Sequence, residues 1–537
     1  MKKLLQSLFL LLFIAFQATA QDRTVTGTVT DKMDGLPLPG VGVRVKGTNL
    51  GTSTGSNGQF SVTVPKGSNT LTFTFIGYAT QDVVIPAGNT MKVVLSSSSE
   101  SLNEVVITAG GVSIQRREQG NQATTIKAED LTQGKAFNVA SALSGKVAGL
   151  QVNAVGSGVN PSVRLVLRGN RSLLGNNQAL VVVDNVIVPN TILGNLNPED
   201  IEDIQVLNGA GAAALYGSDA SNGALIITTK TGKKGKTTVN VAQTTSLETV
   251  AFLPKLQERF GSGTGPDDIP TYTPYENQQY GPAFDGSIRP IGKKLADGSI
   301  QTAPYSNNEK EGKNAFWDTG LNNQTDFSLA SGDDKGSYYF SSQYFDQKGT
   351  VPGDLFNRFT LRLNGTRDIS KKFNFAFNAN YVQNRYDLGP SGSAFEQVLN
   401  SPGNIPLTRY SDWRNDPYST PSGYYNEYID NPYFTLGNNR TLTRNDYLTG
   451  NVQFKFFPIK ELSLLFRVSM STRNASSKGW SDKYTYSDYR LGITSNFTNR
   501  TGSVSDGASY DTQLNPEFQA QYIKKLTKDF SLNTILG

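Results

Sequence analysis

The residue types best suited to hold a ligand are aromatic, and they gather in the segment 389–440. Flat aromatic rings can stack on sugar rings or pack against a partner that closes over the segment. The same rings can instead pack the segment against itself or lie at a membrane interface. The candidate ligand contacts are Trp413, Tyr424, Tyr425 and Tyr428.

Histidine and cysteine are absent from the 537 residues. Their absence excludes the Ser-His-Asp and Cys-His nucleophile systems, disulfide bonds and the common zinc sites. Paired carboxylates and oxygen-ligated calcium stay possible in principle, but no segment has the pattern of a compact cleft domain. We therefore predict no catalytic residue, no metal site and no cofactor, and a protein that is not an enzyme.

One glycine-rich segment has the spacing of a nucleotide-binding loop. Residues 209–214 follow a predicted strand, open a predicted helix and satisfy the loose pattern G-x-G-x-x-A. A dinucleotide site also needs an acidic residue roughly 20 positions further on, where this chain has Thr228, Thr229 and Lys230. The mismatch argues against a dinucleotide site.

The first 20 residues are typical of a secretory signal peptide. Lys2 and Lys3 precede an apolar run at 8–16, and residues 18–20 form a small-residue cleavage site. The run is shorter than the roughly 20 apolar residues that a membrane-spanning helix needs. Gln21 would begin the mature chain, and it cannot carry the lipid that a cysteine carries. We expect an exported protein without a lipid anchor.

Residues 21–96 alternate short β runs with turn residues, which predicts a small β-sandwich. In residues 71–75 the apolar side chains occupy every second position, the period of a strand. Glycine, proline and asparagine between the runs supply the turns. The expected strands cover 24–30, 41–46, 59–64, 70–76 and 91–95.

A hinge and an extended segment are expected at 97–120. The serine-rich stretch 96–101 is flexible by composition. The residues after it form either one more strand of the sandwich or an extended segment that pairs with a sheet edge of a partner. Such pairing uses main-chain hydrogen bonds and leaves a weak sequence signature. The candidate partner-binding residues are Asn103, Glu104, Val105, Val106, Ile107 and Thr108.

Residues 121–234 mix helix and strand signals, whereas 235–537 hold long alternating segments. In residues 373–379 the odd positions are apolar and two of the even ones are Asn, as a strand between lipid and a wet lumen requires. A soluble β-sandwich predicts the same alternation. Short connections at 368–372 and 458–461 contrast with the long segment 389–440. The expected strands cover 237–243, 326–330, 338–345, 358–363, 373–381, 447–456, 462–470, 518–523 and 530–535.

Motifs in residues 21–96 and 121–234 resemble known families. Residues 25–31, 38–41, 58–60 and 75–78 resemble the carboxypeptidase-regulatory-like domain, an accessory fold that implies no peptidase activity. Several blocks in the same order resemble the plug of the SusC/RagA family of TonB-dependent outer-membrane transporters. These blocks are 142–152, 166–169, 180–184, 197–202 and, most specifically, 212–217 with 222–230.

The resemblance implies a mainly β protein with an N-terminal sandwich, an α+β plug at 121–234 and an antiparallel transmembrane β-barrel from 235 onward. Plugged barrels have 22 strands, and about nine or ten are found here, so the barrel is expected to be incomplete and the chain truncated.

The implied activity is import of a glycan or oligopeptide across the outer membrane of a Gram-negative bacterium, with residues 103–108 as the TonB box. The implied partners are the inner-membrane complex of TonB with ExbB and ExbD, a SusD-like surface lipoprotein and outer-membrane lipid, and no nucleic acid. A surface-exposed β-rich binding or adhesion protein without transport is the alternative.

The chain departs from the family pattern at two places. Asp184-Asn185 replaces Asp-Gly, and because Asn tolerates left-handed backbone angles the turn is expected to be kept. Residues 208–211 replace a Lys-Asp-Ala-Ser run and remove two charges. The fold is therefore carried over from the family, and a polar network is not.

Overall fold

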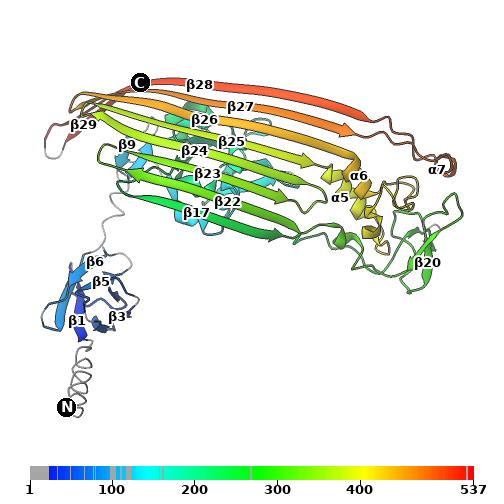
Figure 1. Cartoon of the computed structure of the whole chain (residues 1–537), viewed down its shortest axis with the longest axis horizontal. Coiled ribbons are helices and arrows are strands. Elements are labelled where there is room, and N and C mark those ends of the chain that lie inside the picture. Colours follow the sequence, from blue (N-terminus) through cyan, green and yellow to red (C-terminus); the bar gives the residue numbers. More distant parts are fainter. Residues whose placement is uncertain are drawn as a thin grey trace, which may run out of the picture. The chain divides into compact units, whose positions relative to one another are not determined.

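The structure is a computed structural model that forms two compact units, residues 1–120 and 121–537 (Figure 1). It describes residues 23–32, 34–48, 50–65, 67–75, 78, 80–86, 88–96, 105–108, 112–115, 123–155, 158–159, 162–265, 269–527 and 530–537. The predicted signal peptide, most of the serine-rich hinge, Asn103 and Glu104 lie outside the described residues.

The first unit contains the predicted β-sandwich. One sheet has the order β4-β1-β7, and the other has the order β3-β2-β5-β6. Alternate side chains of the strands point inward, so Val25, Val43, Phe60 and Phe73 form a core between the sheets. The strands are β1 (Arg23–Asp31), β2 (Gly42–Val45), β3 (Gly51–Ser53), β4 (Gln59–Val64), β5 (Thr70–Thr74), β6 (Gln81–Val84) and β7 (Thr90–Leu95).

The candidate partner-binding segment is extended. Its described part forms β8 (Val105–Thr108), which pairs antiparallel with β9 (Val112–Gln115). Among the described residues these two strands form a sheet of their own and join neither sheet of the sandwich. The interpretation as one more sandwich strand is therefore wrong for Val105 to Thr108.

The second unit begins with a central domain, residues 123–234, built on a five-stranded sheet of order β10-β15-β16-β13-β14. Beside it lies the hairpin β11–β12. The strands are β10 (Ala123–Lys127), β11 (Leu150–Val155), β12 (Ser162–Leu167), β13 (Leu180–Val183), β14 (Val186–Val188), β15 (Ile201–Leu207) and β16 (Ala224–Thr229). The helical elements are α2 (Ala128–Thr132), α3 (Val139–Leu143), η4 (Asn190–Gly194), η5 (Pro198–Asp200), α4 (Gly209–Tyr216) and η6 (Gly217–Ala220).

Short helices join these strands, and local chemistry fixes their ends. The Asn138 side chain accepts a hydrogen bond from the amide of Ser141 at the start of α3. The predicted helix start at 197–200 gives only the single turn η5, because β15 begins at Ile201. Helix α4 follows β15, but β15 and β16 are antiparallel. This topology is not the parallel crossover of a dinucleotide-binding fold, which is a second argument against that site.

The turn between β13 and β14 keeps the conformation expected from the sequence. Asp184 and Asn185 both have positive φ, 46° and 67°. Two residues with positive φ form the type I′ turn that matches the twist of a two-residue hairpin. Asn185 thus fills a position where glycine is the usual residue, as predicted.

The rest of the second unit is one large antiparallel sheet of nine strands in sequential order (Figure 1). Each of the nine alternating segments identified in the sequence lies in one strand, apart from a single residue at the start of the last. The strands are β17 (Gly235–Glu248), β22 (Gly320–Gly332), β23 (Gly336–Lys348), β24 (Leu355–Ser370), β25 (Phe373–Leu388), β26 (Asn439–Ile459), β27 (Leu462–Ser481), β28 (Ser503–Lys525) and β29 (Ser531–Leu536).

Connections at the two ends of this sheet differ in length. At the turn end, residues 371–372 and 460–461 close hairpins, as predicted. At the loop end, residues 249–319, 389–438 and 482–502 fold into small elements. The first two segments share an apolar cluster, and Tyr484 of the third packs on Phe434. These elements are β18 (Gly263–Thr264), β19 (Thr271–Tyr272), β20 (Ile288–Ile291), β21 (Gln301–Pro304), η8 (Lys313–Phe316), α5 (Ser391–Asn400), η9 (Leu407–Ser411), α6 (Pro432–Asn438) and α7 (Asp488–Ile493).

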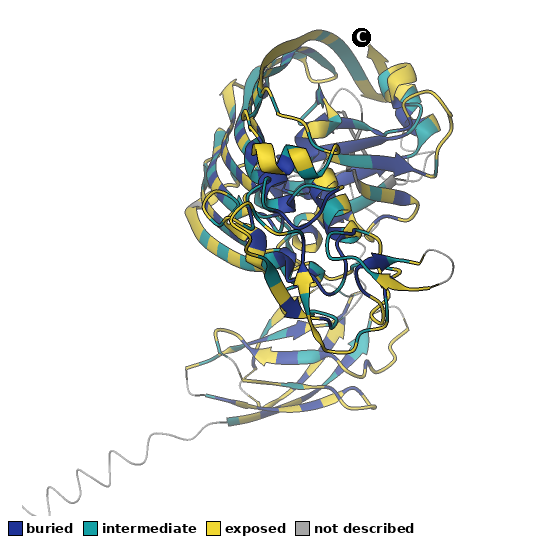
Figure 2. Cartoon of the chain, turned by 90° about the vertical axis from the view of Figure 1, so that its right-hand side faces the viewer, coloured by how far each residue is buried: buried dark blue, intermediate teal, exposed yellow. Residues whose placement is uncertain are grey.

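The two faces of the large sheet reverse the usual burial pattern of a soluble protein. On β24 the apolar Phe359, Leu361 and Leu363 are 38%, 38% and 41% exposed, whereas Arg358 and Arg362 between them are 1% and 2% exposed. We call the face of Phe359 the outer face and the face of Arg358 the inner face. Figure 2 shows the alternation as stripes along the strands. Among the described residues, no helix is long and apolar enough to cross a membrane.

Candidate functional site between the central domain and the large sheet

The inner face of the large sheet holds the central domain through buried polar groups. Arg362 on β24 donates from Nη1 to Asp184 Oδ2 and to Thr229 Oγ1, both at 3.1 Å. Its Nε lies 3.4 Å from Asp200 Oδ2. One guanidinium from the sheet thus joins the β13–β14 turn, η5 and the end of β16.

Neighbouring side chains complete this cluster. Asn364 donates to Thr229 Oγ1 and to the carbonyl of Lys230, both at 2.8 Å. The Tyr339 hydroxyl donates to Asp200 Oδ1 at 3.0 Å, and Asn451 donates to the carbonyl of Asp184 at 2.6 Å. We call this cluster the latch, and it consists of Asp184, Asp200 and Thr229 of the central domain with Tyr339, Arg362, Asn364 and Asn451 of the sheet.

A second set of polar contacts lies nearer the loop end. Arg358 donates to the carbonyls of Phe137 and Gly194, at 2.7 and 3.0 Å. Asn197 donates to Asp326 at 3.0 Å, and Asn384 donates to Asn195 at 2.7 Å. The sheet supplies most of the donors, and the central domain supplies most of the acceptors.

Few apolar side chains of the sheet contribute to this interface. Among the described residues, Val382 and Tyr447 are the sheet residues in the main core cluster of the central domain. Phe345 and Phe356 form a smaller cluster with Val159. Hydrogen bonds between polar groups can exchange for hydrogen bonds to water at a modest net cost. The arrangement can therefore hold the central domain in one position and also release it.

Sequence reasoning missed the latch, although one signal for it exists. On β24, Arg358, Thr360, Arg362 and Asn364 occupy the positions between the apolar residues. Polar residues at every second position of a strand indicate a wet or polar-lined face. The partners of Arg362 lie 133 and 178 positions away, and nothing in the local sequence identifies them.

Asp354, in the connection between β23 and β24, joins the central domain to the loops. Its Oδ1 accepts a hydrogen bond from the amide of Gly389 at 2.8 Å and lies 3.5 Å from Arg440 Nη1. A Cβ at Gly158 of the central domain would lie 2.8 Å from Asp354 Oδ2. Burial raises the pKa of Asp354 to about 6, although Arg440 opposes this shift and Asp387 adds to it.

The raised pKa predicts a pH-dependent stability. Protonation of Asp354 stabilises the folded protein below the usual carboxyl pKa of 3.8, and this contribution is lost as the pH rises through about 6. Asp354→Asn should therefore flatten the stability profile between about pH 4 and pH 6. Thermal unfolding at several pH values would measure it. An unchanged slope in the variant would show that Asp354 titrates normally.

The four aromatic candidates of the sequence have different surroundings. Tyr424 and Tyr425 are 1% and 2% exposed and lie in the apolar cluster of the loops. Trp413 packs on Phe434 with 5.2 Å between ring centroids, and Tyr428 is 50% exposed. A ligand cannot reach the rings of Tyr424 or Tyr425 in this structure, because these rings pack the loops against themselves. Ligand contact stays a prediction for Trp413 and Tyr428.

Two alanine substitutions should distinguish a ring that packs the loops together from a ring that contacts the ligand. Tyr424→Ala should destabilise the protein by about 3 kcal/mol, because it leaves a cavity in the loop cluster. Tyr428→Ala should leave the melting temperature within about 1 °C, because its ring is half exposed and surface changes cost little. Ligand affinity should fall in Tyr428→Ala at unchanged stability. Equal affinity in wild type and Tyr428→Ala would remove Tyr428 from the ligand site.

Two family models match the chain. The CarboxypepD_reg-like domain matches residues 25–107, and the TonB-dependent Receptor Plug Domain matches residues 115–224. The second match includes most of the central domain, and it contains Asp184 and Asp200 of the latch.

Curated relatives and solved structures agree with these matches. A TonB-dependent receptor of Formosa agariphila is 30% identical over 70% of this chain and 34% of its own length. The TonB-dependent receptor SusC of Bacteroides thetaiotaomicron is 28% identical over 99% of this chain and 52% of its own length. The chain thus spans about half, or less, of the length of these relatives.

One solved structure is similar over most of the chain. The RagAB peptide importer in its open-open state aligns with a TM-score of 0.57 at 18% identity. The alignment covers 80% of this chain and 48% of that chain. At this identity the similarity concerns the fold: a plug-like central domain set against a large antiparallel sheet.

Proposed function

Because this chain belongs to the SusC/RagA family of TonB-dependent receptors, we propose that it acts in TonB-driven import across the outer membrane of a Gram-negative bacterium. In this proposal residues 1–20 direct export, and the central domain, residues 121–234, is the plug. Residues 235–537 form the first part of the barrel wall around it. Residues 21–96 form the accessory sandwich, and residues 97–120 hold the hinge and the TonB box.

The reversed burial pattern of the large sheet carries this proposal. Its outer face presents Phe359, Leu361 and Leu363 to the surroundings, and its inner face buries Arg358 and Arg362 against the plug. A sheet in water would expose the arginines and bury the apolar side chains. A sheet with lipid on one side and a polar lumen on the other has the observed pattern.

The mechanism follows from where the contacts lie. A solute arriving from the loop end meets the loops and the plug residues near Asn195. TonB pairs with residues 103–108 by main-chain hydrogen bonds, and a pull on this segment is transmitted to the plug. The latch then opens, which uncovers the polar inner face of the sheet and provides a path lined by Arg362, Asn364 and their neighbours.

The substrate class we propose is a glycan or an oligopeptide. The relative SusC is a TonB-dependent receptor, and RagAB is a peptide importer. Amide, hydroxyl and guanidinium groups on the inner face can form hydrogen bonds with either class. The partners in the proposal are TonB with its inner-membrane complex and a SusD-like lipoprotein that closes over the loops.

A growth panel tests the proposal. The source bacterium and an in-frame deletion strain would be grown on single glycans and on oligopeptides as the only carbon or nitrogen source. Import predicts that the deletion strain fails on one class and recovers when the gene is restored. Binding of a compound to the cell surface, with growth independent of this gene and of TonB, would instead support a binding or adhesion protein.

A further inference from the structure

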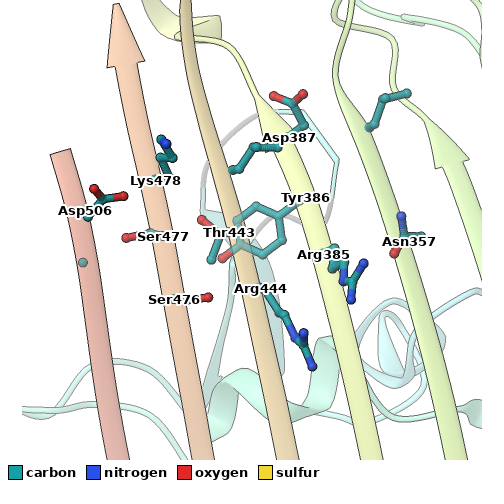
Figure 3. A pocket seen from close by; sticks show the side chains of 13 residues that line it. Asn357, Arg385, Tyr386, Asp387, Thr443, Arg444, Ser476, Ser477, Lys478 and Asp506 are labelled. Carbon is teal, nitrogen blue, oxygen red and sulfur yellow. The ribbon is translucent and has the colours of Figure 1, made fainter. Parts of the chain in front are cut away.

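A cavity of about 710 Å³ lies across strands β24 to β28, near the loop end of the large sheet (Figure 3). Side chains of Leu355, Arg385, Leu442, Arg444 and Lys478 contribute to its lining. Leu355 and Leu442 are 46% and 43% exposed, and Arg385 and Lys478 are exposed. The cavity therefore opens on the outer face, away from the plug.

Strand register places two arginines of the cavity directly opposite each other. Arg385 on β25 pairs with Arg444 on β26, and Figure 3 shows the two side chains on adjacent strands. Like charges directly opposite on neighbouring strands destabilise a sheet. The pair therefore needs compensating negative charge, which Asp446 supplies at Arg444 and no ion pair within the described residues supplies at Arg385.

Nearby carboxylates compensate only part of the positive charge of the cavity. Asp446 accepts hydrogen bonds from Arg444 at 2.8 and 3.0 Å. Asp387 accepts one from Arg440 at 2.7 Å. Within the described residues, Arg385 and Lys478 form no ion pair. Asp387 and Asp506 also line the cavity, and Asp506 lies directly opposite Lys478 on β28.

The cavity also lies at the border between two zones of the outer face. On β25 the outward positions toward the turn end hold Phe373, Phe375, Phe377 and Ala379, followed by Tyr381. The next outward positions toward the loop end hold Gln383, Arg385 and Asp387. Tyrosine commonly marks the level of lipid headgroups at a membrane interface. Arg385 is thus four residues beyond the interfacial tyrosine, on the loop side.

We propose that this cavity binds a phosphate group of an anionic glycolipid in the outer leaflet. Arg385 binds the phosphate with its guanidinium group, and Arg444 contacts it through Nη1, because its Nε and Nη2 bind Asp446. Lys478 contacts the sugar-phosphate headgroup from β27. The acyl chains follow the apolar outer face below, along Phe359 and Leu361. Guanidinium groups suit phosphate because their paired N–H donors match its oxygens. The inference rests on the proposed outer-membrane location and adds a lipid partner to it.

Lipid binding can be measured directly on the purified chain in detergent. The chain would be offered two synthetic glycolipids that differ only in the phosphates of the sugar headgroup, and in a separate sample inorganic phosphate alone. Native mass spectrometry would count bound molecules. We expect about tenfold more phosphorylated than dephosphorylated lipid bound, because basic side chains attract an anionic headgroup.

Variants locate the site. The double variant Arg385→Gln/Lys478→Gln should lower binding of the phosphorylated lipid to the level of the dephosphorylated one. Arg367→Gln is the matched control, because Arg367 is exposed near the turn end of the same sheet and pairs with Asp333. It should leave binding unchanged. If the double variant fails to fold, the comparison of the two lipids on the wild-type chain still decides.

Three outcomes would overturn the inference: equal binding of the two lipids, unchanged binding in the double variant, or occupancy of the same site by inorganic phosphate alone. Flotation of the chain with lipid vesicles separates this inference from the proposed function. A chain that does not float contradicts the membrane location itself. A chain that floats but shows no preference for phosphate contradicts only the lipid site.

Discussion

Arg362→Gln is expected to lower the free energy that holds the plug on the sheet by about 3–5 kcal/mol. Arg362 is 2% exposed, and it contacts the carboxylates of Asp184 and Asp200. Removing the guanidinium leaves both carboxylates buried without their cation, and glutamine cannot replace two ionic contacts. Amide hydrogen exchange in β13 and β16 should accelerate strongly, because β13 ends just before Asp184 and β16 ends at Thr229 of the latch.

Two further variants make this result specific to the latch. Arg367→Gln removes an ion pair on the same strand, but Arg367 and Asp333 are 54% and 61% exposed, so the expected cost is at most about 1 kcal/mol. Adding Asp184→Asn to Arg362→Gln should recover part of the loss, because it removes one uncompensated charge. If Arg362→Gln exchanged hydrogen no faster than Arg367→Gln, the latch would not hold the plug.

Val106→Pro is expected to reduce solute uptake to the level of a strain without the gene. Val106 lies in the middle of β8, an extended segment of Val105–Thr108. Proline has no backbone N–H and removes a hydrogen bond from any strand pairing. Pairing with a partner strand depends on such main-chain bonds. Uptake and the binding of purified periplasmic TonB should both be lost, at normal protein levels in the outer membrane.

Two substitutions serve as controls for the proline. Val106→Ala keeps the backbone donor and should retain most of the uptake, because strand pairing tolerates varied side chains. Ser113→Pro disturbs β9, the hairpin partner of β8, while it leaves residues 103–108 intact. It should also retain uptake. Loss of uptake in Ser113→Pro to the same degree as in Val106→Pro would assign the function to the hairpin and refute the proposed TonB box.

The sequence predicted the positions of the large strands better than their lengths. The expected segment 373–381 lies in β25, which continues to Leu388. The prediction ended where outward apolar residues end, because beyond Tyr381 the outward positions are polar and the apolar Val382, Tyr386 and Leu388 lie at the inward positions. The strand continues because backbone pairing with β24 and β26 extends through Arg385 and Asp387. Beyond the apolar zone, pairing rather than side-chain hydrophobicity determines the strand.

Other features were missed because the local signal was weak or the contacts were distant. The sandwich strands β3 and β6 are short edge strands with the sequences GTS and QDVV and mostly exposed side chains. Pairing with β2 and β5 makes these two segments strands. The pattern of their own side chains does not predict this. The latch joins residues 133 to 267 positions apart. Alternation shows that Arg362 faces inward, but only the folded arrangement identifies Asp184 as its partner.

The surface between the plug and the sheet is polar, and this also determines how the plug responds to a pulling force. Parting two dry apolar surfaces returns all of their area to water, at about 25 cal/mol for each Å². Parting hydrogen-bonded groups costs about 0.5–1.5 kcal/mol for each pair, because water takes over each bond as it breaks. The contacts of Asn364, Asn384 and Asn451 can therefore yield one after another under a steady pull. A plug that is released in such small steps dissipates little of the work done by the pull as heat. It returns along the same path once the pull ends.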